Sequence, residues 1–506
     1  MDEVLRIGFG LFGLAVLIGI TWLFSNNRSR VDWTLVGIGI ALQIGFAALV
    51  LLVPGGRDVF DALGHGFVRI LAYVNAGSEF IFGSLMNVDT YGFIFAFQVL
   101  PTIIFFASLM AVLYHLGVMQ AVVRGMAWAI TKVMRVSGAE TTSVCASVFI
   151  GQTEAPLTVR PYISKMTESE LITMMIGGMA HIAGGVLAAY VGMLGAGDLA
   201  QQQFYAKHLL AASIMAAPAT LVIAKILIPE TGEPLTRGTV RMEVEKTSSN
   251  IIDAAAAGAG DGLKLALNIG AMLLAFIALI AMINGMLGWL GAFDSAGIPP
   301  VRRMVLALAA AVLAAAAVAF ALRRRAGAEA AGWQRFAPGR RAGFATAAVA
   351  AIATFYLLSP GWSINALVAG VSGAPFQLTL EAVFGFVLAP IAWLIGVPWQ
   401  DAGVVGSLIG QKVVINEFVA YLQLADIVNG RVEGVALSDQ GRLIATYALC
   451  GFANFSSIAI QIGGIGGLAP DRRQDLARFG LRAVLGGTVA TLMTATIAGV
   501  LTNLGA

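Results

Sequence analysis

Charged side chains are scarce in this sequence. Of its 506 residues, only 12% are Asp, Glu, Lys or Arg, whereas about 25% is usual for a soluble domain. The mean hydropathy is +0.85, and 58% of the residues are hydrophobic. An ordinary soluble domain is therefore excluded, and the composition predicts a polytopic membrane protein. The net charge of +3 comes without a long basic run, so we expect no nucleic-acid partner.

Cysteine and histidine are also rare. The two cysteines, Cys145 and Cys450, both fall in apolar segments and imply no disulfide framework. The four histidines belong to no HExxH motif, and no Gly-x-Ser-x-Gly motif occurs. A zinc or serine hydrolase therefore lacks a recognisable set of ligands or catalytic residues. We expect neither an enzyme nor a resident cofactor, and no metal site is predicted.

One polar stretch, residues 149–156, interrupts the apolar sequence. An arm of about ten mostly apolar residues flanks it on each side, and a helix of that length covers roughly 15 Å, half of a ~30 Å hydrocarbon layer. The pattern predicts a re-entrant hairpin whose tip, 151–156, lies near mid-membrane and carries Glu154. A carboxylate at this depth is costly unless it faces protein or a water-filled cavity. Glu154 therefore either binds a polar ligand or caps the tip.

The same order of elements occurs twice in the chain. After the hairpin, an apolar segment over 168–191 is interrupted by paired glycines at 177–178 and 184–185, and a full span follows over 203–228. Each such glycine weakens a helix by about 1 kcal/mol, so we expect a broken helix. The second half repeats this order with a polar tip at 410–418, an interrupted segment over 445–468 and a span over 481–501.

Duplication with discontinuous helices at corresponding places is typical of secondary transporters whose site lies between the repeats. We therefore predict an all-α polytopic membrane protein with inverted repeats, each holding a re-entrant helical hairpin, a broken transmembrane helix and a full transmembrane helix. A channel would instead show rings of repeated polar residues. The expected regions are N-terminal transmembrane and interfacial helices (1–90), the first repeat (91–229), a loop and long scaffold helix (230–293), an inserted helix pair (294–372) and the second repeat (373–506).

Positive charge in the loops predicts the topology. The arginines of the loop 25–32 place it in the cytoplasm and the amino terminus outside. The inserted spans, 302–322 and 343–360, bracket a second arginine-rich loop, which is also expected in the cytoplasm. Two amphipathic segments, 57–80 and 118–135, are expected to lie at the membrane interface.

Three motifs carry a resemblance to a known family. They are Gly-Gln-Thr-Glu-Ala-Pro (151–156) followed by Val-Arg-Pro-Tyr (159–162), Asn-Glu-Phe-Val-Ala-Tyr (416–421), and the stretch 448–464 around Gly-Phe-Ala-Asn-Phe-Ser-Ser. In this order they resemble the concentrative nucleoside transporter family, over most of residues 90–290 and 375–505. The resemblance implies a homotrimer in the bacterial inner membrane. It further implies uptake of uridine, and possibly other pyrimidine and purine nucleosides, driven by a cation and carried by an elevator-like moving domain.

The resemblance also implies the residues of the substrate site. The nucleobase would be held by Gln152, Thr153, Glu154 and Val186. The ribose hydroxyls would be held by Glu417, Phe452, Asn454 and Ser457. The chemistry of these side chains agrees, since an amide can donate and accept along a base edge and an ionised carboxylate accepts from hydroxyls. A site built to bond a hydroxyl strongly rejects an analogue that lacks it.

The positions that match the sodium ligands of the family are Ser147, Ile150, His181 and Ile182. Here an amide has become Ser147 and a hydroxyl has become His181, whose nitrogen is a poor sodium ligand. An imidazole titrates near pH ~6.5, and a protonated His181 could supply the charge that sodium supplies elsewhere. We therefore hypothesise proton coupling, with His181 or a site carboxylate as carrier. Two alternatives stay open: sodium coupling through Ser147 and water, and a His181 that only bonds a carbonyl exposed at the helix break.

Overall fold

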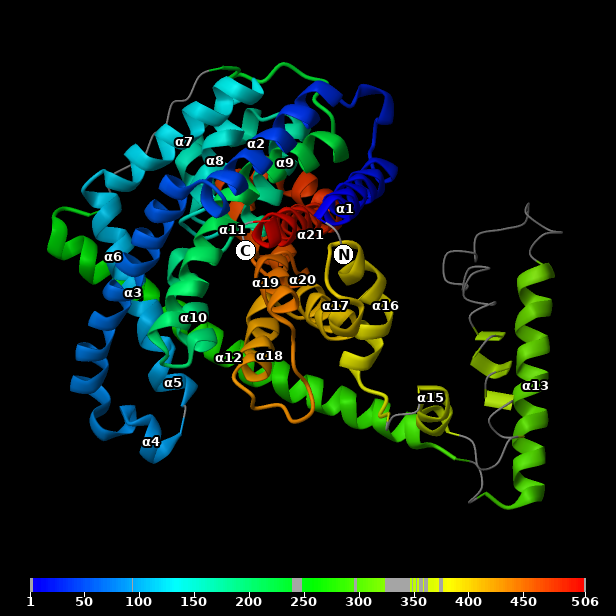
Figure 1. Ribbon diagram of the computed structural model, residues 1–506. Helices are drawn as coiled ribbons and strands as arrows, with labels where there is room; N and C mark the ends of the chain where they lie inside the picture. Colours follow the sequence, from blue (N-terminus) through cyan, green and yellow to red (C-terminus); the bar gives the residue numbers. More distant parts are fainter. Residues whose placement is uncertain are drawn as a thin grey trace. The chain divides into compact units, whose positions relative to one another are not determined.

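The described part of the chain is all-helical (Figure 1). The computed structural model describes residues 3–92, 94–238, 248–294, 298–323, 363–372 and 376–504, with short pieces between 346 and 358, and contains no β-strand in these ranges. Seven described helices are long and apolar enough to cross a membrane. Helices α16 (Leu380–Leu394) and α17 (Trp399–Val414) are bent by 116° at the break between them. If this pair is taken as one span, the count is eight. The prediction of an all-α, multi-pass protein is confirmed.

The N-terminal helices agree closely with the segments expected from hydropathy. The two amphipathic segments are helical, as α3 (Pro54–Phe82) and α7 (Val118–Met134). The apolar segment Phe95–His115 between them is divided at Val99 into α5 and α6. The elements are α1 (Glu3–Leu23), η1 (Arg28–Arg30), α2 (Trp33–Leu51), α3 (Pro54–Phe82), η2 (Gly83–Met86), α4 (Val88–Tyr91), α5 (Phe95–Gln98), α6 (Leu100–His115) and α7 (Val118–Met134).

The two repeats follow in the expected order. The first consists of α8 (Gly138–Ser147), η3 (Ala155–Lys165), the broken helix α9 (Glu168–Ala180) and α10 (Gly184–Gly195), and α11 (Leu199–Leu227). The second consists of α17 and α18 (Glu417–Val428), the broken helix α19 (Asp439–Ala448) and α20 (Phe455–Leu468), η6 (Pro470–Arg472) and α21 (Arg473–Leu504). Helix α21 packs against α9, α11, α19 and α20, so the full span of one repeat contacts both broken helices.

The first broken helix is interrupted between its glycine pairs rather than at them. His181 is extended, and Gly177 and Gly178 are ordinary helical residues of α9. Their role is close packing: a Cβ on Gly178 would lie 2.9 Å from the Gln152 Cβ, and one on Gly177 would lie 3.0 Å from a methyl of Val144. Because Gly178 has no side chain, the hairpin tip at Gln152 can pack directly against α9.

Both hairpins differ in detail from the expected form. The second tip is shorter than 410–418, because α17 continues to Val414 and only two residues separate it from α18. Gly410 is helical, and a Cβ there would lie 2.5 Å from the Phe384 side chain, so it too serves packing. The second arm of the first hairpin is the 3-10 segment η3, kinked at Val159 and containing Pro156 and Pro161. Proline lacks the N–H that a regular α-helix needs.

Two compact units divide the chain, one formed by residues 1–277 with 384–506 and the other by 278–383. The second unit holds the end of α12 (Ile251–Ala292), α13 (Pro300–Arg323) and α15 (Ile364–Ser372). The inserted span 302–322 corresponds to α13, whereas 343–360 lies largely outside the described residues. All residues proposed for the substrate site belong to the first unit.

A buried ion cluster ties the base of the first hairpin to the neighbouring helices. The Lys225 Nζ on α11 lies 2.8 Å from a carboxylate oxygen of Glu140 on α8 and 3.3 Å from one of Glu230, with exposed side-chain fractions of 6% for Lys225 and 1% for Glu140. It also donates to the Ser169 hydroxyl of α9. Because the carboxylate of Glu140 is buried, it depends on this lysine for its charge balance.

We expect Lys225→Met to lower the free energy of unfolding by about 3 kcal/mol, because removing one partner of a buried ion pair leaves the other charge uncompensated. Thermal unfolding of the detergent-solubilised protein measures this. Lys264→Met is the matched control, since the Lys264 side chain is 77% exposed in its pair with Asp261. Equal unfolding temperatures for the two variants would contradict the assignment.

Candidate functional site

Gln152 in the first hairpin reaches the second repeat. Its Nε2 donates to the Ser457 hydroxyl at 3.1 Å, and its Oε1 accepts from the Gln461 Nε2 at 3.2 Å. The Gln461 amide also donates to the Met175 carbonyl at 2.9 Å. All three polar side chains are buried. The hairpin tip of the first repeat and α20 of the second are therefore joined by a chain of hydrogen bonds inside an apolar bundle.

Glu417 is held by donors from both repeats. The Asn454 Nδ2 donates to one carboxylate oxygen at 2.8 Å, and the Tyr190 hydroxyl of α10 donates to the other at 3.2 Å. The Asn454 Oδ1 caps α20 by accepting from the Ser457 N–H at 2.9 Å. Glu417 is 6% exposed and forms no salt bridge with any described residue. A buried carboxylate with donors but no cation in contact is therefore present between the repeats.

Aromatic rings fix the donor Tyr190. Its ring stacks on Tyr421 with centroids 4.2 Å apart and meets Phe418 edge-on at 5.2 Å. The Tyr421 hydroxyl in turn donates to the Thr446 carbonyl at 2.7 Å. These contacts leave the Tyr190 ring little freedom, so its hydroxyl is preorganised toward Glu417.

Lys412 is a second buried charge near this carboxylate. It is fully buried, and its ammonium donates to the Ala448 carbonyl at 2.8 Å and the Thr491 hydroxyl at 2.9 Å. It thus satisfies the end of α19 rather than pairing directly with Glu417. The buried part of the site contains one acid and one base that do not touch.

The remaining residues predicted for the substrate lie around this network without joining it. Val186 is 4% exposed, and Phe452 and Thr153 are half-buried. Glu154 is exposed, its side chain forms no hydrogen bond with any described residue, and its carboxylate folds back over Gly151. The sequence predicted that Glu154 and Glu417 occupy equivalent buried positions at the two hairpin tips. In the structure Glu417 is buried, whereas Glu154 is exposed.

Two of the four predicted ion-coupling positions, His181 and Ile182, lie in the break between α9 and α10. The His181 Nδ1 is 2.7 Å from the Gly177 carbonyl oxygen, and the side chain is 1% exposed. The Ser147 hydroxyl donates to the Ser143 carbonyl at 3.0 Å within its own helix. Ile182 is buried and Ile150 half-buried. His181 therefore makes the carbonyl bond that the simpler interpretation expected.

Backbone bonds hold both breaks together. The Gly184 N–H donates to the Phe149 carbonyl at 3.0 Å, and the Phe452 N–H donates to the His181 carbonyl at 3.3 Å. The tip of the first hairpin and the breaks of both repeats thus meet at one place.

Two residues of this network, Tyr190 and Gln461, were missed from the sequence. Gln461 follows Ser457 by four residues, which puts both side chains on one helical face. Gln461 carries the amide side chain of α20, whose residues after Ser457 are otherwise apolar. Tyr190 likewise is the polar side chain of the apolar helix α10. For Tyr190 the available signal was a single polar side chain in an apolar helix, and for Gln461 it was an amide on the same helical face as Ser457.

The sequence matches family models over most of its length. One described as the C-terminus of the Na+ dependent nucleoside transporter matches residues 208–332 and 321–499, and its N-terminal counterpart matches 12–85. A third, described as a gate for nucleoside recognition, matches 96–197.

Individual relatives extend this likeness to nearly the whole chain. The sequence is 40% identical over 498 residues to an uncharacterized transporter of Haemophilus influenzae, covering 98% of each chain. It is 34% identical over 503 residues to the nucleoside permease NupC of Helicobacter pylori, again covering 98% of each. The solved structure of CNTnw in an inward-facing, substrate-bound state is 40% identical, covers 99% of each chain and superposes with a TM-score of 0.75. With these matches added to its fold, the chain belongs to the concentrative nucleoside transporter family and is a multi-pass membrane transporter rather than an enzyme.

Proposed function

We propose that this chain imports nucleosides by cation symport, with protons as the coupling ion and the substrate bound between the two repeats. The observation that carries the proposal is the buried Glu417 carboxylate, which accepts from Asn454 and Tyr190 and forms no salt bridge within the described part of the chain. Uridine is the simplest substrate that fits, and other pyrimidine and purine nucleosides share its ribose.

The ribose side of the proposal rests on hydrogen-bond chemistry. Each ribose hydroxyl both donates and accepts, and the Glu417 carboxyl group keeps acceptor positions beyond the two that Asn454 and Tyr190 occupy. When Glu417 carries the coupling proton, its O–H adds one donor toward a ribose oxygen. The Asn454 side chain is oriented by its own capping bond to α20. Glu417 can therefore accept from a ribose without losing its existing donors.

The base side rests on Gln152. Its amide carries both a donor and an acceptor, now used by Ser457 and Gln461. A nucleobase edge offers the complementary pair, so a bound base would replace bonds that the protein makes with itself. Thr153, Glu154, Val186 and Phe452 remain proposed contacts around this amide.

For the coupling ion, we favour protonation of Glu417 over protonation of His181. His181 forms no salt bridge with any described residue, and burying an uncompensated imidazolium is costly. Sodium coupling is the second candidate. The description of the family model as Na+ dependent favours it, and the Ser147 oxygen retains lone pairs for a metal ion.

The assembly and movement of the protein belong to the same proposal. We infer a homotrimer in the bacterial inner membrane whose transport domain moves in an elevator-like manner against a scaffold, with the hairpins re-entrant. At 42 residues, α12 is roughly 63 Å long, about twice the hydrocarbon thickness. A helix of that length must tilt strongly or run partly along the interface, which suits a scaffold element.

Glu417→Gln should reduce the apparent affinity for uridine by about tenfold to a hundredfold. The amide replaces an acceptor oxygen by an NH2 group, which leaves a buried donor of Asn454, Tyr190 or the ribose unpaired, at a cost of about 1–3 kcal/mol. Radiolabelled uridine uptake in proteoliposomes measures the change. Glu433→Gln, in the exposed loop after α18, is the matched control. The variant should also discriminate less against 2′,3′-dideoxyuridine, and unchanged uridine transport would remove Glu417 from the ribose site.

An imposed pH gradient, acid outside, should drive uridine accumulation in these proteoliposomes, whereas an imposed sodium gradient at uniform pH should not. His181→Ser should keep the response to pH if Glu417 carries the proton. Loss of that response in the His181 variant would identify His181 as the carrier instead. Accumulation that follows sodium and ignores pH would establish the second candidate.

A further inference from the structure

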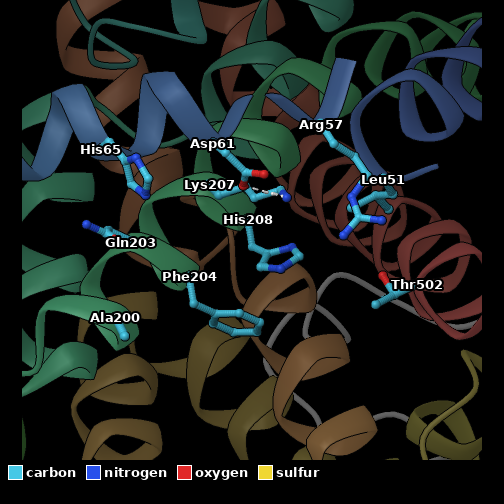
Figure 2. Close-up of a pocket in the computed structure, with 10 residues that line it drawn as sticks. All are labelled: Leu51, Arg57, Asp61, His65, Ala200, Gln203, Phe204, Lys207, His208 and Thr502. Atoms are coloured by element: carbon cyan, nitrogen blue, oxygen red, sulfur yellow. Dashed lines mark ion pairs between the residues drawn. The ribbon is translucent and has the colours of Figure 1, made fainter. Parts of the chain in front are cut away.

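A pocket separate from the substrate site lies where several membrane-spanning helices end (Figure 2). It has a volume of about 460 Å³, and its walls come from the end of α2, the first turns of α3 and α11, and Thr502 near the end of α21. Cavities of this size commonly hold small ligands. None of the residues proposed for nucleoside or ion binding lines it.

The pocket has an excess of positive and donor groups. The Lys207 Nζ lies 2.7 Å from the Asp61 carboxylate, so these two charges offset each other. The Arg57 guanidinium and the His65 ring also line the pocket, on opposite sides of the Lys207–Asp61 pair (Figure 2), and have no ion pair or side-chain hydrogen bond among the described residues. The pocket therefore keeps at least one uncompensated positive charge.

His208 adds a buried donor to this space. The residue is 6% exposed, and its Nδ1 lies 3.0 Å from the Tyr447 hydroxyl. If the tyrosine donates that bond, the neutral ring carries its proton on Nε2, for which the described residues offer no acceptor. A guanidinium without an ion pair, a lysine ammonium and an imidazole N–H are the kinds of donor that oxyanions accept, most of all a phosphate group.

The exposed apolar stripe of α3 favours a position of this pocket at the level of lipid headgroups. Its exposed apolar residues Val59, Leu63, Ile70 and Tyr73 form one stripe, being 57%, 50%, 36% and 72% exposed. Arg57, Asp61 and His65 lie on the opposite side of the same helix, by the 3.6-residue period. An interfacial helix rests at the boundary of acyl chains and headgroups, so its polar side meets the phosphate layer.

We propose that this pocket binds the phosphate group of an anionic phospholipid, with Arg57 as the main contact and Lys207, His65 and His208 as further donors. The same phosphate chemistry occurs in free inorganic phosphate, which is the other source to be tested. The proposal does not depend on which nucleoside or which coupling ion the transporter uses.

The test measures ligand-induced shifts in the unfolding temperature of the full-length protein in zwitterionic detergent. Short-chain phosphatidylglycerol, phosphatidylcholine of the same chain length and inorganic phosphate are titrated separately. Phosphatidylglycerol should stabilise the protein and phosphatidylcholine should do so far less. Arg57→Gln should weaken the phosphatidylglycerol effect by about tenfold in apparent affinity. Arg69→Gln, an exposed arginine on the same helix outside the pocket, should leave it unchanged.

The variant Asp61→Asn tests whether Arg57 binds the lipid or only stabilises the fold. Removing the one acid of the pocket should strengthen phosphatidylglycerol binding, opposite in sign to Arg57→Gln. Each shift is referred to the ligand-free unfolding temperature of the same variant, so a general loss of stability does not mimic the result. Equal shifts in all variants, or weakening by both substitutions, would overturn the proposal. Stabilisation by inorganic phosphate as strong as that by the lipid would overturn the lipid as the source.

Discussion

The need to satisfy a carboxylate inside an apolar bundle is the constraint on which this structure depends. Glu417 sits where water is largely excluded, and a buried acid without hydrogen-bond partners would be strongly destabilising. Its donors come from Tyr190 in one repeat and Asn454 in the other. The satisfaction of one side chain therefore requires both repeats to be folded and correctly placed, and the proposed substrate site lies at the place where they meet.

Close backbone approach makes that meeting possible. Gly178 allows α9 to pack directly on the first hairpin tip, and Gly451 adopts a φ of +149°, where a Cβ would lie 2.8 Å from the Met179 carbonyl oxygen. Helix breaks also leave backbone groups without helical partners. The bonds from Gly184 to Phe149 and from Phe452 to His181 satisfy several of them across segments. The close-packed glycines and the broken helices together form a compact polar centre within the membrane-spanning bundle.

The order of elements was predictable because hairpins, breaks and spans each leave a local signal in hydropathy and polar residues. Gln152, Glu417, Asn454 and Ser457 were named through the family resemblance, and the structure brings them together. The exact breaks were not predictable, since Gly177 and Gly178 weaken a helix locally yet remain helical once packed against Val144 and Gln152. The roles of Tyr190 and Gln461 depend on contacts across 227 and 309 positions of sequence, which no local pattern specifies.

Under the proposed cation symport, charge balance at this centre would relate substrate binding to the membrane potential. With Glu417 ionised and Lys412 protonated, the buried part of the empty site has no net charge, and an uncharged nucleoside does not alter that. A bound cation, whether a proton on Glu417 or a sodium ion nearby, adds one positive charge. Moving one charge across the membrane is worth about 2.3 kcal/mol per 100 mV. A negative interior would therefore draw the loaded site inward and let the empty, neutral site return without opposing that potential.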